Sequence, residues 1–480
     1  MTAAGAPGLR PTIVEALADF TCATDFSKLP PEVVAESKRV LLDSIGCGLA
    51  GKDQLKGIVG IELASLSHGA RDDATVIGSS ESSSVFGAAF ANSELISALD
   101  FDAILAPGHV APVVIPVALA SGESAAASGK EVLTAIAIGH EISCRIAYAM
   151  DGLRDVESGK VLQRPVVGYS CIVFGAAATS TKLMNLPPGP TASAIGIVGS
   201  IAPVHSHGAW SAHTPSTTVK YMVGGAFAQT ALTAAYMGKF GHRGDREMLD
   251  DTEFGFPRFI GTSRWDHRSI TRGLGVEWLF PKAQTYKPYP HCRVLHGLID
   301  TLVLLVEEHD LKPDEIQEIR SWGEGWHRQP TWLNTNIEHV VDAQNSMSHG
   351  LALAAHRIPP SKRWQDQQVV FDSSVMGLMT RVVTKIHPSY TGYLNEYPAN
   401  RPARIEIDAR GTMFAAERMF PKGTPSIDPS TTMSTEELVA KFRTNADGEL
   451  PDAAVDAIVA TVLDLQEVPD VRDLTRLLRP

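Results

Sequence analysis

Two carboxylates and one imidazole stand close together in the segment LDFDAILAPGHVAPVVIP, residues 99–116. Asp100, Asp102 and His109 are its only ionisable side chains, and apolar helix-like sequence lies on either side. A Pro-Gly pair before the histidine predicts a helix end followed by a loop. Ionisable groups on such a loop are typical of acid–base chemistry. Taken alone, the pattern favours a simpler interpretation, in which Asp100 caps a helix and His109 is a hydrogen-bonded core residue.

A second polar cluster, residues 208–229, contains His213 and Lys220 just before a helix-like stretch rich in glycine and alanine. A lysine at the start of a small-residue helix becomes a proton donor or acceptor if burial lowers its pKa. The alternative is an ordinary surface lysine, which is the better interpretation of a lone lysine. His205 and His207 lie nearby without the spacing of a metal site, so we expect no metal there.

The third cluster is AQTYKPYPHCRVLHG, residues 283–297, where four basic side chains lie around two prolines before an apolar helix. They are Lys287, His291, Arg293 and His296. Cations near a helix N-terminus form a natural anion site, and arginine can bind a carboxylate with two hydrogen bonds. A solvated basic turn explains the same pattern equally well.

Composition excludes several classes of protein. The chain has 480 residues, a net charge of -12, and 44% hydrophobic residues. The acidic balance argues against nucleic-acid binding. No apolar stretch has membrane-spanning length, and the N-terminus lacks the pattern of a signal peptide. Five scattered cysteines are typical of reduced thiols, which predicts a cytoplasmic protein. No zinc, Walker or dinucleotide motif is present, so we expect no cofactor.

The periodicity changes along the chain. Residues 12–270 are dominated by helical spacing, with predicted helix ends at Gly51 and before Pro187. After about residue 275, alternating β-branched segments appear at 316–326, 380–388 and 401–420, with a hairpin turn at Ala409–Gly411. Amphipathic helices return after Pro429, the first one starting at Ser434. The pattern predicts a mainly α protein with a smaller α+β part. Its helical domain is formed by residues 1–275 and 430–480, and residues 276–429 are the inserted α+β domain.

Several stretches in this order together resemble the MmgE/PrpD family, which includes 2-methylcitrate dehydratase, cis-aconitate decarboxylase and iminodisuccinate epimerase. They are LLDSIGCGLAG, ALDFD followed by GHVAPVVIP, FGAAATSTKLMNL, the Lys220 segment, YKPYPHCRVLHG, DAQNSMSHGLALA, and PKGTPS leading to TEELVAKFR. The resemblance covers nearly the whole chain. It implies a helical domain with an α+β lid, a homodimer, and a site between the domains that takes di- or tricarboxylates without metal or organic cofactor.

The resemblance implies that the family's aspartate corresponds to Asp100, its loop histidine to His109 and its two lysines to Lys220 and Lys287, and other polar residues of the chain complete the set of candidates. The catalytic candidates are Asp100, His109, Tyr169, Lys220 and Lys287, which we expect to converge on one pocket. The substrate-binding candidates are Asp102, His213, Tyr289, His291, Cys292 and Arg293.

This chain departs from the family pattern at the site itself. Tyr169 replaces a histidine found in members that act on cis-aconitate, and Cys292 replaces the decarboxylase histidine. Ala103 and Ile104 stand at the usual acidic and threonine positions, and the common His-Pro-Ser becomes His-Val-Ala. We expect Lys220 or Lys287 to lower the pKa of Tyr169.

Three functions fit these residues. The first is a lyase, either dehydratase or decarboxylase, acting on a polycarboxylate. The second is an epimerase, with Tyr169 on one side of a stereocentre and Lys220 or His109 on the other. The third is a carboxylate-binding homologue without catalysis. The sequence does not name the substrate.

Overall fold

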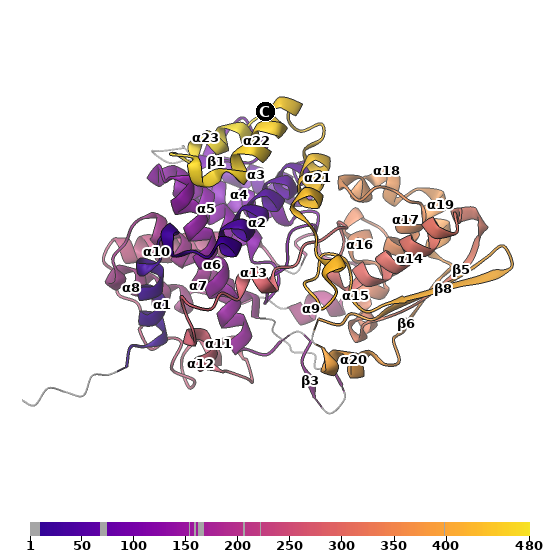
Figure 1. The fold of residues 1–480 in the computed structure, drawn as a ribbon, viewed down its shortest axis with the longest axis horizontal. Helices are drawn as coiled ribbons and strands as arrows, with labels where there is room; N and C mark the ends of the chain where they lie inside the picture. Colours follow the sequence, from indigo (N-terminus) through magenta and orange to yellow (C-terminus); the bar gives the residue numbers. More distant parts are fainter. Residues whose placement is uncertain are drawn as a thin grey trace, which may run out of the picture.

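The computed structural model describes residues 10–67, 74–152, 154–157, 160–161, 168–204, 207–220, 222–397 and 399–480. They form two lobes that lie side by side (Figure 1). The helical lobe contains the first helices and the last helices of the chain, and the sheet lobe contains a four-stranded sheet with helices around it. The predicted fold class, mainly α with a smaller α+β part, is confirmed.

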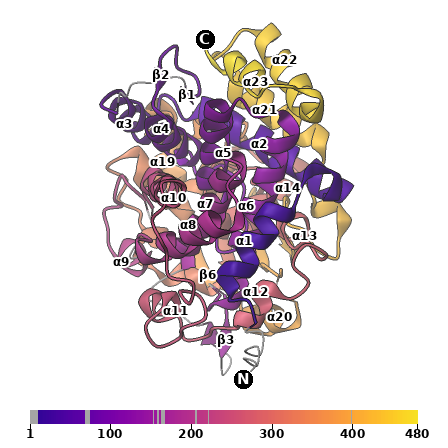
Figure 2. The same cartoon turned by 90° about the vertical axis from the view of Figure 1, so that its left-hand side faces the viewer.

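The helical lobe is built around helices that are buried on nearly all sides. Figure 2 shows α5, α6 and α7 in its middle, and every residue from Ala111 to Glu123 of α5 is buried. The longer helices that the first half of the chain gives to this lobe are α1 (Ile13–Ala23), α2 (Pro31–Ala50), α3 (Leu55–Ser65), α4 (Val85–Ser97), α5 (Ala111–Ala125), α6 (Gly129–Ala149), α7 (Ile172–Leu183), α8 (Pro188–Ser200) and α10 (Gly224–Lys239). The ends predicted at Gly51 and before Pro187 are confirmed.

Small residues let the central helices approach closely. A Cβ atom added to Gly175 of α7 would lie 2.1 Å from the carbonyl oxygen of Gly139 in α6. The alanine- and glycine-rich composition of these segments therefore has a packing reason, since larger side chains would push the backbones apart.

The sheet lobe contains β5 (Ile316–Gly323), β6 (Val382–Ile386), β7 (Ala403–Ala409) and β8 (Thr412–Arg418) in the order β6-β5-β7-β8. β5 and β6 are parallel, whereas β7 pairs antiparallel with β5 and β8. The hairpin predicted at Ala409–Gly411 is confirmed, with Arg410 and Gly411 both at positive φ, as a two-residue turn requires. α14 (His296–Glu308) packs on this sheet.

The chain returns to the helical lobe at its end. Ser434 caps α21 (Thr435–Ala446) in a reciprocal capping box with Glu437, as its sequence predicted. α21 packs on α2, and α22 (Asp452–Leu463) follows it on the same side (Figure 1). The exact domain limits at residues 275 and 429 stay a prediction. Within the described part of the chain, no helix is at once long and apolar enough to cross a membrane.

The close contact of α6 and α7 predicts the effect of added volume. Gly175→Ala should lower the free energy of unfolding by about 1–3 kcal/mol, because the new methyl group overlaps the backbone of α6. The control is Gly377→Ala in α19 (Ser373–Met379), where the new Cβ meets no atom within 4 Å. Replacing this helical glycine should leave the free energy of unfolding unchanged or raise it by ~0.5–1 kcal/mol, because alanine loses less backbone entropy on folding than glycine. Urea unfolding of both variants measures the difference, and equal midpoints would contradict the packing argument.

Candidate active site

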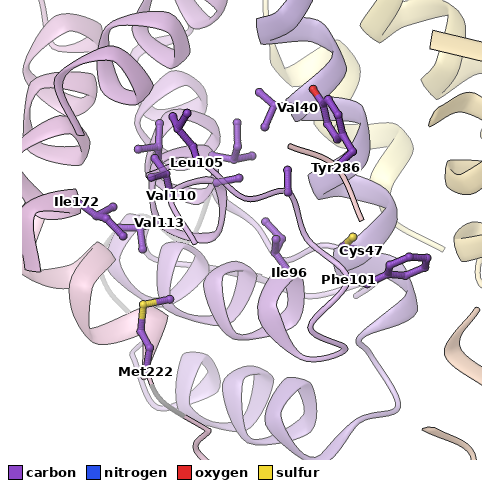
Figure 3. Close-up of a cluster of buried hydrophobic side chains, with 14 of the residues drawn as sticks. Val40, Cys47, Ile96, Phe101, Leu105, Val110, Val113, Ile172, Met222 and Tyr286 are labelled. Carbon is purple, nitrogen blue, oxygen red and sulfur yellow. The ribbon is translucent and has the colours of Figure 1, made fainter. Parts of the chain in front are cut away.

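Asp100, Asp102 and His109 lie on the loop that connects α4 to α5, as the Pro-Gly pair predicted. Phe101 and Leu105 belong to the hydrophobic core, together with Cys47 of α2 (Figure 3). Asp100 and Asp102 are also buried. Asp100 has a φ of 53°, in the left-handed region that residues other than glycine rarely adopt. Such strained backbone is often found at functional sites.

Five consecutive carbonyl groups, starting with that of the last residue of α4, each accept a hydrogen bond from a side chain of a distant segment. The pairs are Lys220 Nζ with Ser97 O (3.0 Å), Gln344 Nε2 with Ala98 O (3.0 Å), Gln365 Nε2 with Leu99 O (2.7 Å), Lys287 Nζ with Asp100 O (2.8 Å) and Lys441 Nζ with Phe101 O (2.7 Å). The carbonyls at a helix C-terminus lack partners within the helix, and its dipole favours positive charge there. We call these five side chains the donor set.

Two lysines of the donor set also meet the carboxylate of Asp100. Asp100 Oδ1 lies 2.7 Å from Lys287 Nζ and 3.8 Å from Lys220 Nζ. Lys220 has a φ of 58°, so both partners of this contact have left-handed backbone. The second and third sequence clusters therefore converge on the first.

His109 completes this group. Its Nδ1 lies 2.7 Å from Asp102 Oδ2, and its Nε2 lies 3.6 Å from Asp100 Oδ1. With a proton on Nδ1, the imidazole donates to Asp102, and that hydrogen bond fixes the ring so that Nε2 faces Asp100. Asp100, His109, Lys220 and Lys287 thus form one buried cluster, which we call the acid–lysine cluster.

The charges of this cluster shift one another's protonation. Burial opposes ionisation of Asp100, but the charges of Lys220, Lys287 and His109 outweigh it and hold the pKa of Asp100 far below its usual range. Burial lowers the pKa of Lys220 to about 8, with Asp100 opposing the shift and Lys287 adding to it. Lys220 is therefore a group that changes protonation close to neutral pH.

Tyr169 lies beside the cluster. Its ring centroid is 6.2 Å from that of His109, and it packs on Gly108 so closely that a Cβ there would lie 2.0 Å from the tyrosine ring. The expected lowering of its pKa is wrong. Burial raises the pKa of Tyr169, and electrostatic interaction with the acidic groups Cys292, Asp100 and Asp102 adds to the rise. Tyr169 is thus a neutral phenol, which can donate a proton in a hydrogen bond but is no base.

The remaining residues of the third cluster divide between two environments. Cys292 accepts a hydrogen bond from Trp332 Nε1 at 3.3 Å, and burial raises the pKa of its thiol. His291 is buried, which lowers its pKa to about 3 and keeps it neutral. Its ring packs against Gly350.

Tyr289 and Arg293 donate hydrogen bonds within the sheet lobe, and their substrate-binding role stays a prediction. The Tyr289 hydroxyl donates to Asp300 Oδ1 at 2.8 Å. The Arg293 guanidinium donates to the carbonyl of Lys422 and to Thr424 Oγ1. Burial and Arg401 lower the pKa of Arg293 to about 9. Both side chains hold the sheet lobe together in this structure.

The histidines in and near the second cluster also lie in different environments. His213 is exposed, whereas His207 is buried with its ring 6.2 Å from Tyr169 and 5.4 Å from Trp210. His205 lies outside the described residues. Tyr169, His207 and Trp210 thus form a line of aromatic rings beside the acid–lysine cluster.

Sequence reasoning missed Gln344, Gln365 and Lys441. Gln344 Nε2 also donates to Gln365 Oε1 at 2.6 Å, and Gln365 Nε2 lies 3.3 Å from the carbonyl of Pro290. They join the end of α4 to the segment that carries Lys287. A cavity of about 510 Å³ is bounded by both glutamines and by Lys220. The other basic residues of its lining are Lys56, His339, Lys362 and Arg363. Asp53 and Asp366 also line this cavity, which reaches Lys220.

Asp100, Asp102 and His109 could in principle hold a metal ion, since each offers one ligand atom and these atoms lie within 4.8 Å of one another. The two ammonium groups at Asp100 oppose a dication, because like charges at such distances repel strongly in a buried site. The donors present fit an anionic ligand better than a metal.

Comparison with known proteins shows the family to which the chain belongs. The MmgE/PrpD N-terminal domain matches residues 15–267 and the MmgE/PrpD C-terminal domain matches residues 289–465, so the chain belongs to the MmgE/PrpD family. It is 26% identical to the cis-aconitate decarboxylase-like protein oryM of Aspergillus oryzae, over 94% of each chain. It is 25% identical to the cis-aconitate decarboxylase of Homo sapiens, over 98% of this chain and 95% of the human one. The cis-aconitate decarboxylase of Aspergillus terreus is 27% identical, over 95% and 93%.

The charge arrangement predicts that the site works without a metal ion. Dialysis against a chelator should leave activity unchanged, because Lys220 and Lys287 already compensate the charge of Asp100. Titration calorimetry with Zn²⁺ or Mn²⁺ should give the same heats for the wild type and for Asp100→Asn. Activity that is lost on dialysis and restored by a divalent ion would overturn this expectation.

Proposed function

We propose that the protein is a lyase that decarboxylates or dehydrates a di- or tricarboxylate without metal or organic cofactor. The observation that carries the proposal is the convergence of two buried lysines, from segments far apart in the sequence, on one carboxylate. The names of the relatives support it, since three of them are described as cis-aconitate decarboxylases or as similar to one.

Both reactions need the same electrostatic help. In a decarboxylation the bond from carbon to carboxylate breaks, CO₂ leaves, and the electron pair remains on carbon, delocalised toward a neighbouring carboxylate. In a dehydration a base takes the proton next to a carboxylate, and the hydroxyl group leaves as water after protonation. Each builds negative charge beside a carboxylate, where a fixed ammonium group in a buried site stabilises it. Lys287, paired closely with Asp100, is placed to do this.

Lys220 is the proton donor in this scheme. Proton transfer is most efficient when the pKa of the donor lies near the working pH, and its pKa is about 8. After decarboxylation it gives its proton to the carbon, and the neutral amine regains one from solvent. The hydrogen bond to Asp102 orients His109, and in this scheme its Nε2 atom assists the proton transfer by Lys220.

The proposal is tested by proton NMR of di- and tricarboxylates, cis-aconitate and citrates among them, incubated with the protein in deuterated buffer. Decarboxylation should give a new alkene product that carries deuterium on the protonated carbon, and dehydration should give a new alkene from a hydroxy acid. Lys220→Met should show neither product. Absence of turnover with every substrate, alongside carboxylate binding measured by calorimetry, would favour the non-catalytic alternative and overturn the lyase.

The acid role of Lys220 predicts a pH dependence. Since the ammonium form is required and its pKa is about 8, kcat/KM should fall tenfold per pH unit above about pH 8. Lys182→Met is the matched control, because burial also lowers the pKa of Lys182, whose Nζ lies near the carbonyl of Cys22 away from the site. The control should keep the wild-type pH profile. A rate that rises through pH 8 would make Lys220 a base instead.

An epimerase is the second candidate, and the position of Tyr169 favours it. A neutral phenol beside His109 could return a proton to one face of a carbon while Lys220 removes it from the other. In the same NMR experiment an epimerase gives deuterium uptake by the substrate without any new alkene signal.

We also propose that the protein is a homodimer of the cytoplasm. α3 leaves four apolar side chains exposed along one side, Leu55, Ile58, Val59 and Leu63, and such a surface is typical of an interface. The five unpaired cysteines suit a reducing compartment. Sedimentation at the mass of one chain would contradict the dimer, and cell fractionation tests the location.

A further inference from the structure

Lys441 lies on α21, in the last part of the chain, yet its ammonium group reaches the segment that carries Asp100 and Asp102. Its Nζ donates to the carbonyl of Phe101 at 2.7 Å and lies 3.9 Å from the centroid of the Phe101 ring. Phe101 stands between Asp100 and Asp102, and Lys441 binds the carbonyl of the peptide group that joins Phe101 to Asp102.

The ammonium group has one acidic partner in this buried position. Lys441 Nζ lies 2.6 Å from Asp43 Oδ1, and both side chains are almost wholly buried. Although burial alone lowers the pKa of an amine, Asp43 outweighs it and the pKa of Lys441 is raised. Lys441 therefore remains charged and is a permanent donor to the carbonyl of Phe101.

The helix that carries Lys441 is fixed closely against α2. A Cβ added to Gly46 would lie 3.0 Å from the Phe442 ring and 3.3 Å from its Cα atom. Asp43 lies one turn before Gly46 on the same helix. Helix α2 thus supplies Asp43 as the charge partner of Lys441, and it also supplies the surface against which α21 packs.

We propose that Lys441 is a positioning residue, which holds the Phe101 peptide so that Asp100 meets the two catalytic lysines and Asp102 meets His109. In the donor set it continues the row of bonds after Lys287, since the two lysines bind the consecutive carbonyls of Asp100 and Phe101. The effect on turnover rests on the proposed function, whereas the effect on the loop does not.

Three variants separate positioning from simple stabilisation. Asp43→Asn removes the carboxylate partner of Lys441, which costs stability, but it keeps the amine that donates to the carbonyl of Phe101. Asp43→Asn/Lys441→Met removes the bond and leaves no unpaired buried charge, which protects the fold. Arg443→Met, two residues further on α21, removes a cation that pairs with Asp456 at the surface. It controls for changes to the helix itself.

Turnover should depend on the hydrogen bond from Lys441 to Phe101 rather than on the charge of Asp43. The double variant should lose kcat on the order of 100-fold, as expected for a small misplacement of catalytic groups, with KM little changed. Asp43→Asn and Arg443→Met should keep most of the wild-type kcat. Equal loss in Asp43→Asn and in the double variant, or wild-type kcat in the double variant, would overturn the proposal.

A second readout does not depend on the reaction. Amide hydrogen exchange, followed by mass spectrometry over residues 99–109, should become faster in the double variant and stay slow in Asp43→Asn and Arg443→Met. If no substrate is found, this measurement still decides the role of Lys441. Exchange as slow in the double variant as in the wild type would refute positioning, even if the lyase proposal stands.

Discussion

The end of helix α4 imposes the constraint on which the rest of the site depends. Its last carbonyls and those just beyond lie in the protein interior, where an unpaired polar group is costly. Five of them, from Ser97 to Phe101, are each bound by a side chain that is remote in sequence. These donors come from both lobes and include Lys441 of α21. Hydrogen bonds to one short segment therefore connect the helical lobe, the sheet lobe and the last part of the chain.

The same hydrogen bonds place the charges. Three of the five donors are lysines, and a helix C-terminus favours positive charge. Burying an ammonium group is costly unless an acidic partner is near, and Asp100 is that partner for Lys220 and Lys287 while Asp43 serves Lys441. The outcome differs for each lysine: the pKa of Lys441 is raised, whereas that of Lys220 falls to about 8. One structural requirement thus provides both a permanently charged amine and a titratable one.

Several features could be predicted from the sequence because they depend on local patterns. The hairpin at Ala409–Gly411 and the capping box at Ser434 follow from turn and capping chemistry within a few residues. Asp100, His109, Lys220 and Lys287 stood out as polar groups in apolar surroundings. Gln344, Gln365 and Lys441 gave no such signal, since a glutamine before an apolar helix or a lysine in an amphipathic helix ordinarily faces solvent.

Residues that are neighbours in the sequence do not always share an environment in the fold. Cys292 and Arg293 are neighbours, yet the thiol meets Trp332 while the guanidinium turns to the 422–424 turn of the sheet lobe. Tyr169 shows the same limit for electrostatics. The expected convergence of Tyr169 with Lys220 or Lys287 in one pocket suggested a lowered pKa for the phenol, but burial and the acidic neighbours raise it.

By itself, the sequence determined the mainly helical class, several element ends and the types of reactive groups available, because these depend on short-range periodicity and on residue identity. Only the tertiary structure decided which carbonyl each lysine binds, which acid it pairs with and where its pKa lies. A hydrogen bond requires atoms about 3 Å apart, and desolvation depends on everything packed around a group. Both are properties of the assembled chain, in which Phe101 and Lys441 are neighbours in space although 340 positions separate them in sequence.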